Sequence, residues 1–310
     1  MHPAYSVILF TTSSGAGYGL LFWLGVFNAF GANPLGRWGT FAALTLALVL
    51  ITIGLLSSTL HLGHPERAWR AFSQWKSSWL SREGVIAVAT YVPAGLWWLF
   101  LATGLSTGVF MGLAAAIGAV ATVWCTGMIY GSLRTIRQWH RPDVAPIYEA
   151  LAAATGALIY GVFASFSADA PLVITFVAIA CVVGAGLMKT TYWRQLDTDS
   201  GQYTVEMATG LGHLGSVRPL DPPHTMPNFV MREMGYSVAR KHASTLRMLV
   251  ITLLFVAPFL LLVLAIALSS FVVFFVLATL LAGCGVVLER WLFFAEAEHV
   301  SMLYYGKERA

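Results

Sequence analysis

Charged residues are scarce in this chain: Asp, Glu, Lys and Arg make up only 10% of its 310 residues, whereas hydrophobic residues make up 58%. The mean hydropathy is correspondingly high, at +0.74. A soluble domain of this length has too little interior to hide so much apolar surface. The shortage of charge therefore excludes a soluble protein and predicts a polytopic membrane protein.

Cysteine is also rare. Cys125, Cys181 and Cys284 lie singly within apolar runs, without the pairing of a disulfide framework or the spacing of a metal site. The sequence also lacks a Walker loop, a nucleophile elbow, an HExxH motif and a cysteine cluster for an iron–sulfur centre. We therefore predict no catalytic residue and no metal site on this chain alone, and we interpret it as a subunit of a larger complex.

Positive charge is missing from the first apolar run, because the first cation is Arg37. Without a charged segment in front of that run, a cleavable signal peptide is not expected. The net charge of +4 does not indicate nucleic-acid binding, because the cations are confined to a few segments between apolar runs.

Histidine is absent from the middle of every apolar run. The eight histidines lie at the ends of runs or in connecting segments, at positions 2, 61, 64, 140, 213, 224, 242 and 299. A b-type haem held within the bilayer needs axial imidazoles that face each other from helix interiors. The sequence therefore predicts no haem on this chain, and any electron exchange is expected at one membrane face.

Long apolar runs are what the chain does contain. A helix needs about 20 apolar residues to cross the hydrocarbon core, and these runs are continuous rather than alternating, which argues against a β-barrel. We predict an all-α bundle of eight transmembrane helices, forming a single integral membrane domain over residues 1–310. The predicted spans lie near residues 5–30, 38–60, 84–103, 107–131, 145–167, 170–189, 247–268 and 270–297. In the first span, Gly15 and Gly19 have the GxxxG spacing that lets a neighbouring helix approach closely.

The cations are distributed unevenly between the two faces that these spans define. The face with both termini holds 17 of the 18 Lys and Arg residues, and the opposite face holds only Arg37. Cytoplasmic segments carry the excess of Lys and Arg in membrane proteins. Both termini are therefore predicted to lie in the cytoplasm.

The connection at about residues 190–246 is long enough to form a cytoplasmic loop module. Its stretch DPPHTMPNFVMREMGYSVARKHAS, at 221–244, is rich in Pro, Met and aromatic residues as well as charge. A solvated linker does not need Met226, Phe229 and Tyr236 so close together. Two interpretations remain open: these side chains pack on the membrane surface, or they contact a partner.

The densest group of titratable residues lies in LHLGHPERAWRAFSQWKSSWLSREG, at 60–84. His61 ends the second span and Glu83 begins the third, so antiparallel helices place both at the cytoplasmic mouth. A quinone takes up protons as it is reduced; histidine titrates near neutral pH, and burial can shift a glutamate towards it. His61 and Glu83 are therefore candidates for quinone binding and proton relay. The alternative is that Glu83 only caps the third helix, with Ser81 at the N-cap position.

Other residues of this segment supply further groups that such a site needs. His64 is a second titratable group, and Arg67 or Arg82 can stabilise the negative charge of a reduced head group. Trp75 or Trp79 can form an apolar wall. An ordinary interfacial loop has similar aromatic residues, so both interpretations stay open.

The last span contains LERWLFFAEAEH, at 288–299, which places Glu289 and Arg290 within an apolar helix. Ionisable residues there are costly and usually face the bundle interior or a cavity. Glu289 is therefore a second candidate for the proton path. For Arg290, extension to the lipid head groups is an equally good explanation.

Three motifs, HLGHPERA at 61–68, SWLSREG at 78–84 and LERWLFFAEAEH at 288–299, resemble the membrane anchor subunits of the dimethyl sulfoxide reductase family. The eight-span plan is similar over essentially the whole chain. The resemblance implies a haem-free anchor in the inner membrane of a bacterium, interacting with ubiquinone or menaquinone. It implies two partners, an iron–sulfur subunit and a molybdopterin catalytic subunit, and it assigns the quinone-binding histidine to His61 and a functional glutamate to Glu83.

The orientation distinguishes branches of this family. The cation distribution places the 60–84 segment, and so the partner subunits, on the cytoplasmic side. This placement and the stretch PNFVMREMGYSVARKHA, at 227–243, resemble the membrane subunit of cytoplasmic sulfite dehydrogenases, which implies electron transfer from sulfite to quinone. The alternatives are an anchor of a dimethyl sulfoxide-type reductase that oxidises quinol and, of another class, a structural anchor or a transporter without a redox role.

Overall fold

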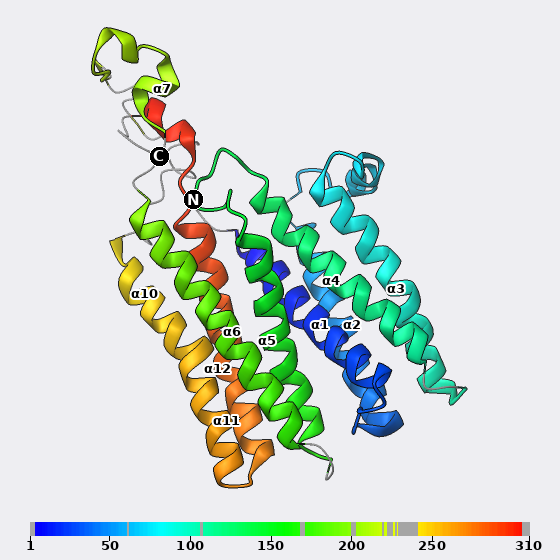
Figure 1. The fold of residues 1–310 in the computed structure, drawn as a ribbon. Coiled ribbons are helices and arrows are strands. Elements are labelled where there is room, and N and C mark those ends of the chain that lie inside the picture. Colours follow the sequence, from blue (N-terminus) through cyan, green and yellow to red (C-terminus); the bar gives the residue numbers. More distant parts are fainter. Residues whose placement is uncertain are drawn as a thin grey trace.

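Long helices account for most of the structure, which is a computed structural model of the chain (Figure 1). It describes residues 4–60, 62–105, 108–167, 171–199, 203–218, 220, 221, 226, 228 and 241–305. Within these residues, eight helices are long and apolar enough to cross a membrane and no β-strand occurs. The prediction of an all-α polytopic membrane protein is confirmed.

Consecutive membrane helices run in opposite directions, so the even number of spans puts both ends of the bundle's chain on one side (Figure 1). Seven of the spans are single α-helices: α1 Tyr5–Ala29, α2 Gly36–Ser57, α3 Trp79–Thr103, α4 Val109–Gly131, α5 Val144–Ala164, α6 Pro171–Thr198 and α12 Phe271–Ala295. The seventh span in chain order is composite: α10 Ala243–Val250, the π-helical η3 Ile251–Val256 and α11 Ala257–Ala267. Pro258 lacks the amide that would bond the preceding turn, and a π-helical turn accommodates this loss.

Two of the predicted span boundaries are wrong. α3 begins at Trp79 rather than near residue 84, and α6 continues to Thr198 rather than ending near residue 189. A count of apolar residues measures only the hydrocarbon thickness, whereas a helix continues into the interface while its backbone groups bond one another. The long sixth connection is correspondingly shorter than predicted and runs from residue 199 to residue 242.

The helix α1 is central and packs against α2, α4 and α5. It approaches α5 most closely where two glycines meet. A Cβ on Gly19 would lie 1.8 Å from the carbonyl oxygen of Ala152, and a Cβ on Gly156 would lie 2.1 Å from the carbonyl carbon of Gly19. The prediction of close packing is therefore right for Gly19 and wrong for Gly15, where a Cβ would meet nothing within 4 Å.

We expect Gly156→Ala to destabilise the bundle by about 1–3 kcal/mol, because the added methyl group forces α1 and α5 apart. The measurement is the thermal unfolding of the purified protein in detergent. Gly15→Ala is the matched control, since its methyl group enters open space and should change stability by less than about 0.5 kcal/mol. Equal stability of the two variants would contradict the close packing of α1 on α5.

The extramembrane elements gather at the end of the bundle where α1 begins and α12 finishes (Figure 1). They are η1 Pro65–Gln74, α7 Val205–Thr209, η2 Gly212–Leu214 and η4 Val300–Tyr305. Buried Val205 and Leu303 join α7 to η4, and the Tyr304 hydroxyl donates to the Ala208 carbonyl at 2.8 Å. The sixth connection thus packs in part on the C-terminal segment.

The aromatic and methionine-rich part of the sixth connection is described only in part. Met226 is 74% exposed, whereas Phe229 and Tyr236 lie outside the described residues. The choice between the membrane surface and a partner therefore stays a prediction for this stretch.

Candidate functional site

The segment η1 is fastened to the start of α3. The Ser78 hydroxyl accepts a hydrogen bond from the Ser81 amide at 3.4 Å and so caps α3. The Ser81 hydroxyl donates to the carbonyl of Ala71. Phe72 packs on Gly84, where a Cβ would lie 2.7 Å from its ring. Capping and packing together hold the polar segment at one position over the α3 terminus.

Arg82, Trp75 and Trp79 belong to this junction. Arg82 donates from Nε to the Trp75 carbonyl at 3.0 Å and from Nη2 to the Lys76 carbonyl at 2.7 Å. Its guanidinium carbon lies 4.3 Å from the centre of the Trp79 ring. Arg82 therefore binds the backbone where η1 ends, and Trp75 remains 53% exposed.

His64 directly precedes η1, and Arg67 lies on the outer surface of η1. His64 Nδ1 is 3.0 Å from Glu66 Oε1, and Arg67 Nε is 3.7 Å from the same oxygen. The side chains of His64 and Arg67 are 66% and 57% exposed. His61 lies outside the described residues, so its place in the site stays a prediction.

Glu83 points into the bundle and is only 4% exposed. Its carboxyl Oε1 is hydrogen-bonded to the hydroxyl of Thr126 on α4. The same hydroxyl oxygen lies 3.0 Å from the carbonyl oxygen of Thr122. Because Ser78 is the N-cap of α3 and the Glu83 carboxyl turns towards α4, the interpretation of Glu83 as a helix cap with Ser81 at the N-cap is wrong.

A buried ion cluster joins α6 and α12. Lys189 Nζ lies 2.5 Å from Glu289 Oε1, and Arg290 Nε lies 2.5 Å from Glu289 Oε2. The three side chains are 1%, 0% and 3% exposed. The extension of Arg290 to the lipid head groups is therefore wrong: its charge stays inside the bundle, because a carboxylate is there to pair with it.

Aromatic rings surround the two cations of this cluster. The Arg290 guanidinium carbon lies 4.0 Å from the centre of the Tyr148 ring, and Lys189 Nζ lies 4.3 Å from that of Tyr192. Such cation–π contacts offset part of the lost hydration. The Tyr148 hydroxyl oxygen lies where it can accept from the Arg290 guanidinium, and no other acceptor for Arg290 Nη1 and Nη2 occurs among the residues that the structure describes. The remaining N–H groups of the guanidinium and the Tyr148 O–H are donors for which no acceptor is described.

Sequence reasoning missed Lys189, because it was counted with the polar residues of the sixth connection. The sequence does contain one indication of its role. A carboxylate inside an apolar helix needs a cation nearby, and Lys189 ends an apolar run on the same membrane face as Glu289.

Glu149 on α5 was also missed. It lines a lateral groove of about 260 Å³ together with Tyr18 of α1. The signal was a single acidic residue in the apolar stretch IYEALAAA, at 147–154.

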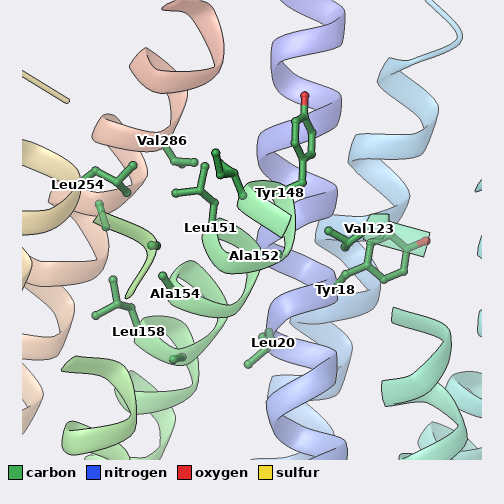
Figure 2. Packing of buried hydrophobic residues seen from close by; sticks show 14 of the residues in the cluster. Tyr18, Leu20, Val123, Tyr148, Leu151, Ala152, Ala154, Leu158, Leu254 and Val286 are labelled. Atoms are coloured by element: carbon green, nitrogen blue, oxygen red, sulfur yellow. The ribbon is translucent and has the colours of Figure 1, made fainter. Parts of the chain in front are cut away.

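A small cavity brings the two candidate glutamates into one region. It measures about 20 Å³ and is lined by Thr126, which bonds Glu83, and by Arg290, which bonds Glu289. Further polar lining comes from Thr11, Thr12, Ser14, Tyr148 and Thr155. Figure 2 shows the surrounding core, in which α5 lies between α12 and α1. A cavity of this size has room for about one water molecule.

Ionisable groups continue from the cluster towards the end of the bundle. Arg247 Nε lies 2.8 Å from Glu296 Oε1, and Arg247 Nη1 lies 2.8 Å from Asp197 Oδ1, which belongs to a 64% exposed side chain. Burial raises the pKa of Glu296, although Arg247 opposes this effect. Burial also lowers the pKa of His299. Glu296 is therefore a buried carboxyl between the ion cluster and solvent.

The fold and these sites define the class: an integral membrane subunit with ionisable groups buried inside its helix bundle. The family model of the DMSO reductase anchor subunit (DmsC) matches residues 1–296. The chain therefore belongs to this family and is a membrane anchor subunit of a molybdoenzyme, within an oxidoreductase complex.

Individual relatives agree with this assignment. The C subunit of the sulfite dehydrogenase of Allochromatium vinosum is 32% identical, over 98% of this chain and 99% of the relative. The anaerobic dimethyl sulfoxide reductase chain YnfH of Escherichia coli is 25% identical, over 44% of this chain and 49% of the relative. No solved structure is similar at a significant level.

Proposed function

We propose that this chain is the quinone-reducing anchor of a sulfite-oxidising molybdoenzyme complex. The full-length similarity to the C subunit of a sulfite dehydrogenase supports the choice of sulfite. The observation that carries the quinone role is Glu83: a carboxyl buried at the start of a membrane helix and bonded to Thr126 of a neighbouring helix, which lines a small cavity.

The chemistry balances in electrons and protons. Sulfite and water yield sulfate, two electrons and two protons at the catalytic subunit. The iron–sulfur subunit passes the two electrons to the membrane, where a quinone takes them up with two protons. This chain binds the quinone, excludes bulk water and delivers the protons.

Glu83 and Thr126 form a unit that can hold or release a proton. Thr126 has one hydroxyl proton but two acceptors in reach, Glu83 and the Thr122 carbonyl. The carbonyl can only accept. When Glu83 is protonated, it donates to the Thr126 oxygen and Thr126 donates to the Thr122 carbonyl, so both contacts persist. When Glu83 loses its proton, the Thr126 hydroxyl rotates and donates to the Glu83 carboxylate.

The partners dock at the end of the bundle that carries η1, α7 and η4, and this end faces the cytoplasm of a bacterium. The support is the positive-inside distribution, since all but one of the cations belong to this side. In this arrangement His64 and Arg67 lie between the iron–sulfur subunit and the bundle, and Glu289 continues the proton path within the bundle. Sulfite oxidation and proton uptake then occur on one face.

A second candidate is the anchor of a dimethyl sulfoxide-type reductase, in which electrons run from quinol to the catalytic subunit. The partial similarity to YnfH favours it. The same groups would then accept protons from quinol. Sulfite-dependent reduction of quinone, measured against dimethyl sulfoxide-dependent oxidation of quinol, separates the two.

The test of the quinone role is His61→Ala in membranes that contain the assembled complex. We expect sulfite-to-quinone turnover to fall at least about tenfold, because a titratable group of the proposed proton path to the quinone is lost. Turnover is normalised to sulfite oxidation with an artificial electron acceptor, and assembly is checked by pull-down of the partners. Full quinone turnover in the assembled variant would leave His61 without a role and favour a purely structural anchor.

A further inference from the structure

A lateral groove leads from the lipid-facing side of the bundle to Arg290. On α12, Thr279, Gly283, Val286 and Arg290 are spaced by four, three and four residues, so they lie on one helix face. The first three line a groove of about 290 Å³ together with residues of α1, α2 and α5. This face therefore connects the middle of the membrane helix with the buried ion cluster.

The groove is apolar along its length and polar at its inner end. Its walls include Leu9, Leu50, Leu158, Ile159 and Val287. At the inner end, four residues line both the groove and the 20 Å³ cavity beside Arg290, namely Thr12, Ala16, Thr155 and Val286. A molecule in the groove therefore reaches the cavity without crossing another helix.

Unpartnered donors mark this inner end. Arg290 is 2% exposed and Tyr148 is 6% exposed. The Tyr148 oxygen can satisfy one N–H of the guanidinium, but the other N–H groups of Arg290 Nη1 and Nη2 and the Tyr148 O–H find no acceptor in the part of the chain described. Leaving such groups unpaired is costly in a buried setting. Donors at the end of an apolar groove fit a ligand that carries a carbonyl oxygen on an apolar body.

We propose that this groove and cavity are the quinone-binding site. This inference rests on the proposed quinone role and states where in the bundle the quinone binds. The apolar tail lies along the groove between α1 and α12, and the head group lies at its inner end. One ring carbonyl accepts hydrogen bonds from the Arg290 guanidinium and the Tyr148 hydroxyl, because the cavity admits an oxygen atom but not a whole ring.

The same geometry supplies charge and protons. Arg290 stays protonated at all relevant pH values, so its charge stabilises negative charge that develops on the carbonyl oxygen. Thr126 lines the same cavity and bonds Glu83, so a proton from Glu83 reaches the head group through one hydroxyl or water molecule. Tyr148 and Arg290 are thus binding residues, and Thr126 is a positioning residue.

Two other occupants explain the groove less well. A lipid acyl chain has no acceptor for Arg290 or Tyr148. The groove on the other side of α5 contains Glu149 and Tyr18, where a carboxyl donates to a carbonyl only while it is protonated and supplies no positive charge. The guanidinium is the persistent donor, and it belongs to the α1–α12 side.

The decisive variant is Gly283→Leu, which fills the groove without a clash because a Cβ at Gly283 meets nothing within 4 Å. In membranes with the assembled complex, we expect the KM for decylubiquinone to rise at least about tenfold, since the leucine excludes the substrate. Gly184→Leu on α6 is the matched control. A Cβ there also meets nothing within 4 Å, and the KM should not change.

A second pair of variants tests the inner end and the competing groove. Tyr148→Phe removes one donor and should raise the KM for decylubiquinone several-fold, with rates normalised to sulfite oxidation by an artificial acceptor. Val120→Phe fills the groove beside Glu149 and should leave the KM unchanged.

Each outcome separates this assignment from the quinone role itself. An unchanged KM for Gly283→Leu, or a raised KM for Val120→Phe alone, would overturn the groove assignment while the quinone role stands. If the wild-type complex oxidises sulfite with an artificial acceptor but never reduces decylubiquinone, the proposed function fails and this site fails with it.

Discussion

Glu289→Gln is expected to lower the stability of the bundle by about 3–5 kcal/mol, because it leaves two buried cations without a carboxylate. Glu289 bonds both Lys189 and Arg290, at 2.5 Å each. Water cannot replace the lost charge at a side chain that is 0% exposed. The loss should appear as a lower melting temperature of the protein in detergent and as less assembled complex in the membrane.

Lys189→Met provides the control for this prediction. It removes one cation and leaves Glu289 paired with Arg290, so it should cost much less than Glu289→Gln. The double variant Lys189→Met/Glu289→Gln should be more stable than Glu289→Gln alone, since only one unpaired cation remains. If Lys189→Met proved the more damaging single change, Glu289 would not be the residue that holds the cluster together.

Glu83→Gln is expected to reduce sulfite-to-quinone turnover about a hundredfold, because the amide can still bond Thr126 but cannot transfer a proton. Glutamine has nearly the size of glutamate and carries no charge, so the contact between α3 and α4 persists. The measurement is the rate of decylubiquinone reduction in membranes, normalised to sulfite oxidation with an artificial acceptor.

Glu66→Gln is the matched control for Glu83→Gln. Glu66 also lies in the polar segment between α2 and α3, but its side chain is 64% exposed. Its replacement should leave the turnover unchanged. A Glu83→Gln variant that assembles and reduces quinone at the normal rate would remove Glu83 from the proton path.

Residues that share a sequence segment have different environments in the tertiary structure. His64, Arg67, Trp75 and Glu83 are close along the chain, yet only Glu83 enters the bundle. The reason is the cap: Ser78 starts α3 one turn earlier than predicted, so Glu83 lies on a buried helix face rather than at the helix terminus. No count of apolar residues detects this shift, because the added turn contains Ser81, Arg82 and Glu83.

The membrane class, the all-α architecture and the number of spans follow from the amino-acid sequence alone. These features depend on local properties, since about 20 consecutive apolar residues force the backbone to satisfy its own hydrogen bonds as a helix. Family membership was also readable, because short motifs such as HLGHPERA are contiguous in the chain.

Which helix faces meet, in contrast, is fixed only when the helices pack. Lys189 and Glu289 are 100 positions apart in the sequence, and Glu83 and Thr126 are 43 apart. Their pairing depends on how far each helix is rotated and how closely glycines such as Gly19 and Gly156 let α1 and α5 approach. The groove that ends at Arg290 arises from the same packing, since four separate helices form its walls.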